Sequence, residues 1–290
     1  MKSILVMILL FVGAAEAAPT EVEQRVRYTS SLNSMAAIVM NWYGSLITTK
    51  TPESFTAIEN QWSDYRSHYA ENITQIKITS TDLKKLDTDK YQFQVKSLIN
   101  NKNPDGKHSE LLSETFVFQV GLLAKPVIES VVRNKAKQTK TPLMAEFNRS
   151  HYKAREFAYA WLAYLDGVDA MQSTIYLEQW LNEASYAIKI GSNKEQGSIV
   201  EMLAKRKQYL TKGGHLLHGL KVKKLDTQAN TFILDLVLEW KGVNQKGKSV
   251  LAKIHQEIEY TVQENNSWKV KSIKEQHLLP DIAPWSGLLC

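Results

Sequence analysis

The pentapeptide "KKLDT" occurs twice in the chain of 290 residues, at positions 84–88 and again at 223–227. The two occurrences lie 139 positions apart, and the Gly-Lys pairs that follow them, at 106–107 and 247–248, lie 141 positions apart. Two stretches that keep their register this closely are typical of a repeated structural unit. The sequence therefore predicts a structural unit that occurs twice in the chain.

Each copy predicts a hairpin of two long strands joined by a polar turn that contains glycine. In the second copy "TFILDLVLEW" leads through "KGVNQKGK" to "SVLAKIHQEIEYTV", with a period of two that predicts a sheet with one buried face. The inward residues expected there are Phe232, Leu234, Leu236, Leu238 and Trp240 in one strand and Ile254, Gln256, Ile258, Tyr260 and Val262 in the other. The opposite face carries His255, Glu257 and Glu259. In the first copy the residues expected to be buried are Phe116, Phe118 and Val120.

Helical sequence precedes each hairpin. "TPESFTAIENQWSDYRSHYA" opens with Thr51 as a cap and Pro52 at the first helical position, and its apolar residues recur every three to four positions. The other segments expected as helices are "SMAAIVMNWYGSL" before it and "REFAYAWLAYLDG", "TIYLEQWLNEASYAIKI" and "SIVEMLAKRKQYL" in the later half. Charge, Pro142 and a lack of periodicity coincide in "RNKAKQTKTPLM", which predicts a solvated linker between the copies.

The first twenty residues carry the pattern of an export signal. Lys2 precedes an apolar run over 4–12, and Ala15 and Ala17 supply the small residues of a cleavage site. A membrane anchor would need roughly 20 apolar residues, about twice this run. We therefore expect cleavage after Ala17 and a periplasmic or secreted protein without stable membrane insertion.

The plan of helices followed by a meander of long strands resembles the nuclear transport factor 2-like superfamily, which includes the SnoaL-like cyclases, ketosteroid isomerase and limonene epoxide hydrolase. The resemblance is clearest in "REFAYAWLAYLDGVDAMQSTIYLEQWL" and from "GLKVKKLDT" to "EYTVQENNSWKVKSIKEQHL". It implies an α+β fold of two tandem cone-shaped domains, each with helices packed on a curved, mainly antiparallel sheet. The expected segments are a signal peptide over 1–17, a first domain over 18–132, a linker over 133–149, a second domain over 150–280 and a tail over 281–290.

Composition and motifs argue against several classes of protein. With 43% hydrophobic and 23% charged residues the chain is typical of globular proteins, and its net charge of +6 forms no stripe suited to nucleic acid. No phosphate-binding loop, dinucleotide glycine fingerprint, nucleophile elbow or metal-ligand spacing occurs in the sequence, so we expect no cofactor and no metal. The single cysteine, Cys290, is the last residue and predicts an unpaired end.

Candidate ligand-binding residues follow from the geometry of the expected cone. If the inward strand face lines it, Trp240, Gln256 and Tyr260 are its amphipathic members, and Tyr164 and Asp166 join them from a helix. They predict a pocket for an apolar or amphipathic small molecule in the C-terminal domain. In the alternative interpretation these aromatic side chains fill the core and Asp166 only ends the helix.

Two histidines in "GGHLLHGL", His215 and His218, suggest a catalytic or metal site. They are three residues apart, follow two glycines and have no third ligand nearby in the sequence. A turn that enters a strand is the favoured interpretation of this stretch.

Two classes of function remain. The favoured one is a non-catalytic binding or scaffold protein of the cell envelope, in which the outer sheet faces pack together or against a protein partner. The alternative is a small-molecule enzyme of isomerase, cyclase or hydrolase type with its pocket in the C-terminal domain. The binding protein is favoured because the inward strand face is almost wholly apolar or neutral and shows no acid or base.

Overall fold

The structure is a computed structural model. It describes residues 21–45, 51, 53–69, 73–101, 109–121, 126–134, 137–139, 149–166, 180–226, 230–244, 248–262 and 268–278. The predicted signal peptide over 1–17, the tail over 281–290 and Cys290 lie outside the described residues.

The first half places helices ahead of a five-stranded antiparallel sheet. Its elements are α1 (Glu21–Gly44), the 3-10 helix η1 (Glu53–Ile58), α2 (Glu59–Tyr69), β1 (Ile73–Lys85), β2 (Lys90–Asn101), β3 (Ser109–Val120), β4 (Pro126–Arg133) and β5 (Lys137–Thr139). The strand order is β1-β2-β3-β4, and β5 also pairs with β3. Pro126 stands at the first position of β4, where a missing N–H donor is tolerated. Because β5 lies within the predicted linker over 133–149, this part of the linker is a strand.

The second half repeats the plan with a six-stranded sheet. Its elements are α3 (Arg149–Leu165), β6 (Ser185–Ile190), β7 (Asn193–Ser198), α5 (Ile199–Tyr209), β8 (Leu210–Asp226), β9 (Thr231–Asn244), β10 (Ser249–Val262) and β11 (Trp268–His277). The strand order is β7-β6-β11-β10-β9-β8, and all neighbours pair antiparallel except β6 and β11.

The repeated pentapeptide occupies the same connection in both halves. Residues 84–88 leave β1 and lead to β2, and residues 223–226 of the second copy are the last residues of β8, which precedes β9. In the first half the turn is closed by the N–H groups of Leu86 and Asp87, which donate to the carbonyl of Lys90. The α+β class with mainly antiparallel sheets is confirmed, and β1-β2-β3-β4 in one half matches β8-β9-β10-β11 in the other.

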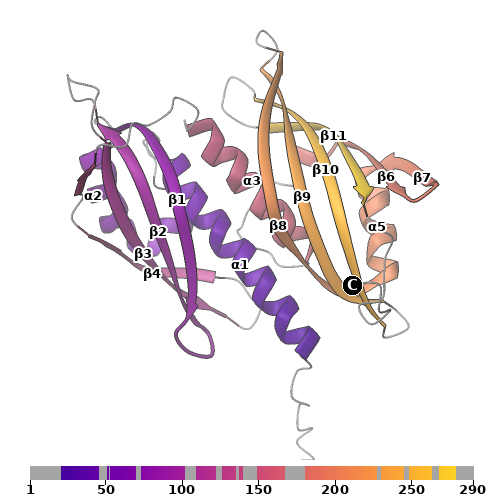
Figure 1. Ribbon diagram of the computed structural model, residues 1–290, viewed down its shortest axis with the longest axis horizontal. Helices are drawn as coiled ribbons and strands as arrows, with labels where there is room; N and C mark the ends of the chain where they lie inside the picture. Colours follow the sequence, from indigo (N-terminus) through magenta and orange to yellow (C-terminus); the bar gives the residue numbers. More distant parts are fainter. Residues whose placement is uncertain are drawn as a thin grey trace, which may run out of the picture.

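The two halves meet through their long helices, because α1 and α3 lie between the two sheets (Figure 1). Ala37 of α1 belongs to the core of the second half, and Tyr152 of α3 belongs to the core of the first. The Tyr152 hydroxyl donates to the Ile76 carbonyl at 2.5 Å and accepts from the Ile78 N–H at 3.2 Å. Of the two packings expected for the outer sheet faces, packing together was wrong, because α1 and α3 lie between the two sheets.

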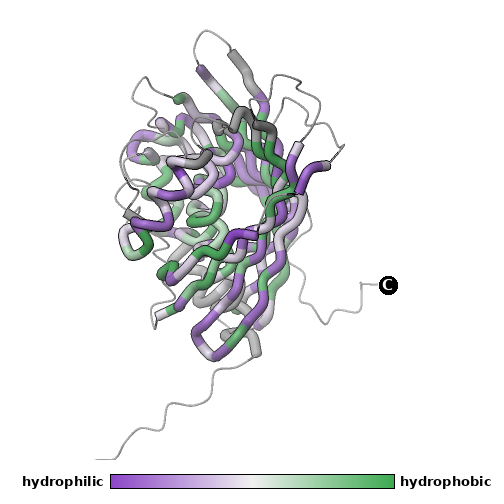
Figure 2. Tube along the Cα trace, turned by 90° about the vertical axis from the view of Figure 1, so that its left-hand side faces the viewer, coloured by the Kyte–Doolittle hydropathy of each residue, from purple (hydrophilic) through white to green (hydrophobic). Residues whose placement is uncertain are grey.

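Hydrophilic and hydrophobic residues alternate along the strands (Figure 2). The expected inward residues Leu234, Leu236, Leu238, Ile254 and Ile258 are all at most 1% exposed, and Phe116, Phe118 and Val120 are buried as well. The helix with Phe55, Ile58, Trp62 and Tyr65 is also confirmed as η1 and α2, with all four side chains buried.

Two local expectations were wrong. The predicted helix "TIYLEQWLNEASYAIKI" ends in a strand, because Ser185–Ile190 forms β6 and pairs with the inner strand β11. The stretch "GGHLLHGL" lies inside β8 and is not a turn. Gly213 leaves room for the indole of Trp240 on the neighbouring strand, because a Cβ at this position would lie 2.2 Å from the indole Nε1. Glycine often marks such a close approach within a strand.

Candidate functional site

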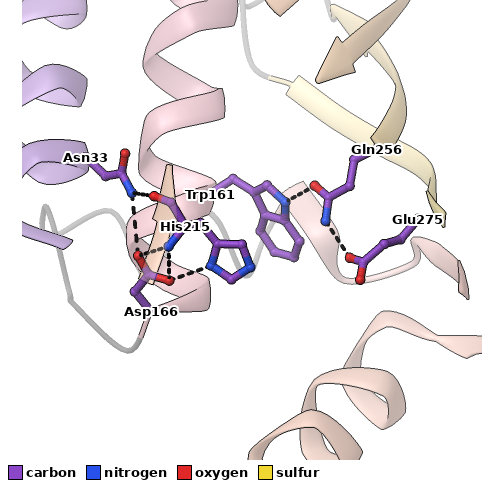
Figure 3. Close-up of polar contacts among 6 residues, drawn as sticks. All are labelled: Asn33, Trp161, Asp166, His215, Gln256 and Glu275. Carbon is purple, nitrogen blue, oxygen red and sulfur yellow. Dashed lines mark hydrogen bonds and ion pairs between the residues drawn. The ribbon is translucent and has the colours of Figure 1, made fainter. Parts of the chain in front are cut away.

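A buried carboxylate and a buried imidazole meet where α3 ends against β8. Asp166 follows the last residue of α3, and its Oδ1 lies 2.5 Å from Nδ1 of His215 (Figure 3). The backbone N–H of His215 also donates to both carboxylate oxygens at 3.1 Å. The side chains of His215 and Asp166 are 1% and 0% exposed. Asp166 does end the helix, as the alternative interpretation has it, and it also fixes the imidazole of His215.

A second polar group lies farther along the same face of the sheet, around Glu275 of β11. The indole N–H of Trp161 on α3 donates to Gln256 Oε1 at 3.1 Å, and the Gln256 amide donates to Glu275 Oε2 at 2.6 Å (Figure 3). The Tyr186 hydroxyl makes a short hydrogen bond to the same oxygen, and His277 Nε2 lies 3.0 Å from Oε1. The Glu275 carboxyl group is therefore buried among several polar partners, as a buried polar group requires.

Glu275 faces inward because β11 contains a bulge. Glu259 pairs with Ser272, but its neighbour Tyr260 pairs with Val270, so Lys271 is the extra residue. The bulge changes the phase of the strand: Trp268 and Val270 are buried before it, and Ile273 and Glu275 are buried after it. The expectation that the inward face carries no acid or base was therefore wrong, since both Glu275 and His215 lie on it.

The predicted ligand-binding residues are buried or half-buried along this face but do not form one cluster. Trp240 is opposite His215 in the β8–β9 pairing, with ring centroids 6.5 Å apart, and Gln256 belongs to the Glu275 group. Tyr260 stacks on Trp268 at 4.0 Å. Since Gln256 and Tyr260 are four residues apart on one strand, they are separated by roughly 13 Å.

The two candidates from the helix, Tyr164 and Asp166, also contact different groups. Tyr164 is half-buried and stacks on Trp161 at 6.1 Å, whereas Asp166 reaches His215. Of the five residues, Asp166 and Trp240 lie near His215, and Tyr260 lies at the other end of the face. Whether the five contact a ligand stays a prediction.

The first half holds a related polar group that sequence reasoning missed. Glu114 on β3 accepts the Tyr43 hydroxyl of α1 at 2.6 Å and the Arg133 Nε of β4 at 3.1 Å. Glu114 is paired with Arg133 across β3 and β4, as Gln256 is paired with Glu275 across β10 and β11. The two halves thus place a cross-strand polar pair at corresponding strands, with a helix side chain donating to it.

Burial is the largest cause of the pKa shifts of Glu114, Tyr43 and Tyr260. It raises the pKa of the Glu114 carboxyl, and the nearby Arg133 guanidinium opposes this rise. Burial, together with the charge of Glu114, raises the pKa of Tyr43 well above its ordinary value, and burial alone raises the pKa of Tyr260. Both phenols therefore stay protonated at neutral pH and act as apolar rings with a hydroxyl.

Neither a metal-binding cluster nor a membrane helix is found in the part of the chain that the structure describes. No three His, Cys, Asp or Glu side chains within it are grouped so that they could hold a metal ion. None of its helices is long and apolar enough to cross a bilayer.

No protein-family model matches the sequence, and no curated protein matches it. Solved structures of the nuclear transport factor 2-like and cystatin-like kind are similar to parts of the chain. A hexachlorocyclohexane dehydrochlorinase from Novosphingobium barchaimii has 13% identity and a TM-score of 0.38, covering 47% of this chain and 91% of its own. A nuclear transport factor 2-like protein from Salmonella enterica has 12% identity and a TM-score of 0.35, covering 47% and 94%.

A protein with a cystatin-like fold from Caulobacter vibrioides has 10% identity and a TM-score of 0.35, covering 46% of this chain and 92% of its own. These proteins are of the kind that the sequence resembles. At such identities and TM-scores the likeness carries no function over to this chain. Any function for this chain has to come from its own residues.

Proposed function

We propose that the second half binds a small apolar or amphipathic molecule and carries out acid–base chemistry on it, with His215 as the base and Asp166 as its positioning residue. The observation that supports this is the buried pair itself, with 2.5 Å between Nδ1 of His215 and Oδ1 of Asp166. A histidine oriented by a carboxylate in a site shielded from water is the arrangement of many general bases.

In this proposal His215 is the tautomer that carries its proton on Nδ1 and donates it to Asp166. Nε2 is then the nitrogen assigned to take a proton from the bound molecule or from a water. The negative carboxylate then stabilises the imidazolium that forms. An isomerase or cyclase needs a proton removed from carbon or oxygen, and a hydrolase needs one removed from water, so the pair supports each of the three classes.

A non-catalytic binding protein is the second candidate, and the near-complete burial of His215 favours it. With its side chain 1% exposed, a molecule reaches the imidazole only if the surrounding side chains move. In this second case the Asp166–His215 pair joins α3 to β8, and an envelope protein would be bound through the outward sheet faces.

Turnover of an unbiased mixture separates the two candidates. The full-length mature protein is incubated with a small-molecule extract of its native cells, and mass spectrometry records which compounds are consumed. We expect the wild type to consume at least one compound and Asp166→Asn to leave it unchanged, because the amide no longer holds the Nδ1–H tautomer. Asp235→Asn is the matched control, since Asp235 contacts His255 at 2.8 Å on the outward face.

Two outcomes would contradict the proposal. If wild type and Asp166→Asn consume the compound equally, the pair has no chemical role. If the wild type retains a compound through purification but converts none, the second candidate is correct.

We also propose that the protein works in the periplasm or outside the cell. The support is the sequence pattern of residues 1–17. Mass spectrometry of the protein from its native cells should show a mature N-terminus at Ala18, and cell fractionation should place it with the soluble extracytoplasmic proteins. An intact leader in the membrane fraction would contradict this.

A further inference from the structure

We infer that the site is built from both halves of the chain, and that Asn33 of the first half is a positioning residue for the Asp166–His215 pair. The Asn33 side-chain amide donates to the His215 carbonyl at 2.7 Å, and its nitrogen also lies 3.5 Å from Oδ2 of Asp166 (Figure 3). Asn33 is 1% exposed, so these contacts form away from water. This inference rests on the proposed function.

A single amide is well suited to this task. Its two N–H groups point in different directions, so one asparagine can hold the backbone of β8 and the carboxylate that follows α3 together. The contact fixes the distance between the two elements that carry His215 and Asp166. Loss of the amide would leave the His215 carbonyl buried without this donor, which is costly in a site of low dielectric constant.

The spacing along α1 explains how a residue of the first half reaches the second. Asn33, Ala37 and Asn41 follow each other at intervals of four and so lie on one face of the helix. Ala37 packs into the core of the second half, and Asn41 accepts the Lys153 ammonium of α3 at 2.9 Å. The face is therefore the side of α1 that contacts the second half, with Asn33 at the position where α3 ends.

Asn41 provides a matched control for Asn33. Both are buried asparagines on the same face of α1, and both bond to the second half, but Asn41 bonds to Lys153 and not to the Asp166–His215 pair. A role limited to holding the halves together would make the two substitutions equivalent. If Asn33 is a positioning residue, substitution of Asn33 changes the state of the His215 imidazole and substitution of Asn41 does not.

The experiment uses nuclear magnetic resonance of the full-length protein with ¹⁵N-labelled histidine. The His215 signals are identified by their absence in His215→Gln. We expect the wild type to show a proton on Nδ1 of His215, and Asn33→Leu to lose or shift that signal while Asn41→Leu keeps it. If Asn33→Leu fails to fold by circular dichroism, Asn33→Ala removes the amide without adding bulk and is measured in its place.

The outcomes separate this inference from the proposed function. If the Asn33 variant keeps the wild-type His215 signal while Asp166→Asn changes it, Asn33 is not a positioning residue, and the Asp166–His215 pair stands. If Asn41→Leu changes the signal as much as Asn33→Leu does, the effect belongs to the interface in general and the inference is overturned. If Asp166→Asn itself leaves the His215 signal unchanged, the pair does not exist in solution and the proposed function fails.

Discussion

Replacing His215 by glutamine is expected to lower the rate of turnover by about 10²–10⁴-fold, the usual contribution of a positioned general base. Glutamine keeps a polar side chain of similar size but cannot take a proton at neutral pH. The measurement compares initial rates of consumption of the compound identified with the wild type. The fold should survive, which circular dichroism checks, because the His215 N–H and carbonyl still bond to Asp166 and Asn33.

His255→Gln is the matched control for this substitution. His255 also contacts an aspartate, Asp235, but lies on the outward face with its side chain 29% exposed. We expect this variant to retain the wild-type rate. Equal rates for the wild type and His215→Gln would show that the buried imidazole is structural.

Replacing Arg133 by methionine is expected to destabilise the first half by about 3–5 kcal/mol at neutral pH, because it leaves a buried carboxylate without its cation. The Glu114 side chain is 0% exposed and the Arg133 side chain 21% exposed, so solvent cannot replace the lost contact fully. Urea unfolding of the full-length protein measures the loss. Lys90→Met is the control, since Lys90 and Glu129 form an exposed pair in the same sheet, and should cost at most about 1 kcal/mol.

The pH dependence of this loss has a definite sign. The pKa of Glu114 in the folded protein lies above the ordinary carboxyl value of 4.5, chiefly because of burial, so the folded state holds the proton more tightly than the unfolded chain. The stability linked to this proton is fully present below pH 4.5 and is lost as the pH rises through the folded value. Without Arg133 the pKa of Glu114 in the folded protein is higher still, because the guanidinium no longer lowers it. The stability deficit of Arg133→Met relative to the wild type should therefore be smaller at pH 5 than at pH 7. A deficit that is constant over this range would contradict the assignment.

The strand faces were predictable from sequence because successive side chains of a regular strand point to opposite faces of the sheet. Leu234, Leu236 and Leu238 follow that rule, and their burial is confirmed. Glu275 could not be placed in this way, because the bulge at Lys271 reverses the phase of β11 and sequence alternation carries no signal for a bulge. The last part of the helix expected over 174–190 was wrong because residues 185–190 form β6. This short strand pairs in parallel with an inner strand, and such strands lack a clear period of two.

The site was only partly predictable because its residues meet through tertiary packing. Asp166 was identified as a candidate from its place after an aromatic helix, and Trp240 from its strand face. His215 was set aside because two glycines before it indicate a turn, whereas Gly213 makes room for the Trp240 indole. Asn33 gave no signal, since its partners lie 133 and 182 residues away in the chain.

The location of a bound molecule tests the central claim most directly. The mature protein, purified from its native cells or loaded with the compound that it consumes, would be crystallised and the molecule located in the electron density. We predict that a polar atom or reacting carbon of the molecule lies within about 3.5 Å of Nε2 of His215, with Nδ1 still bonded to Asp166. A molecule bound elsewhere, with the side chains around His215 packed as they are without it, would contradict the claim.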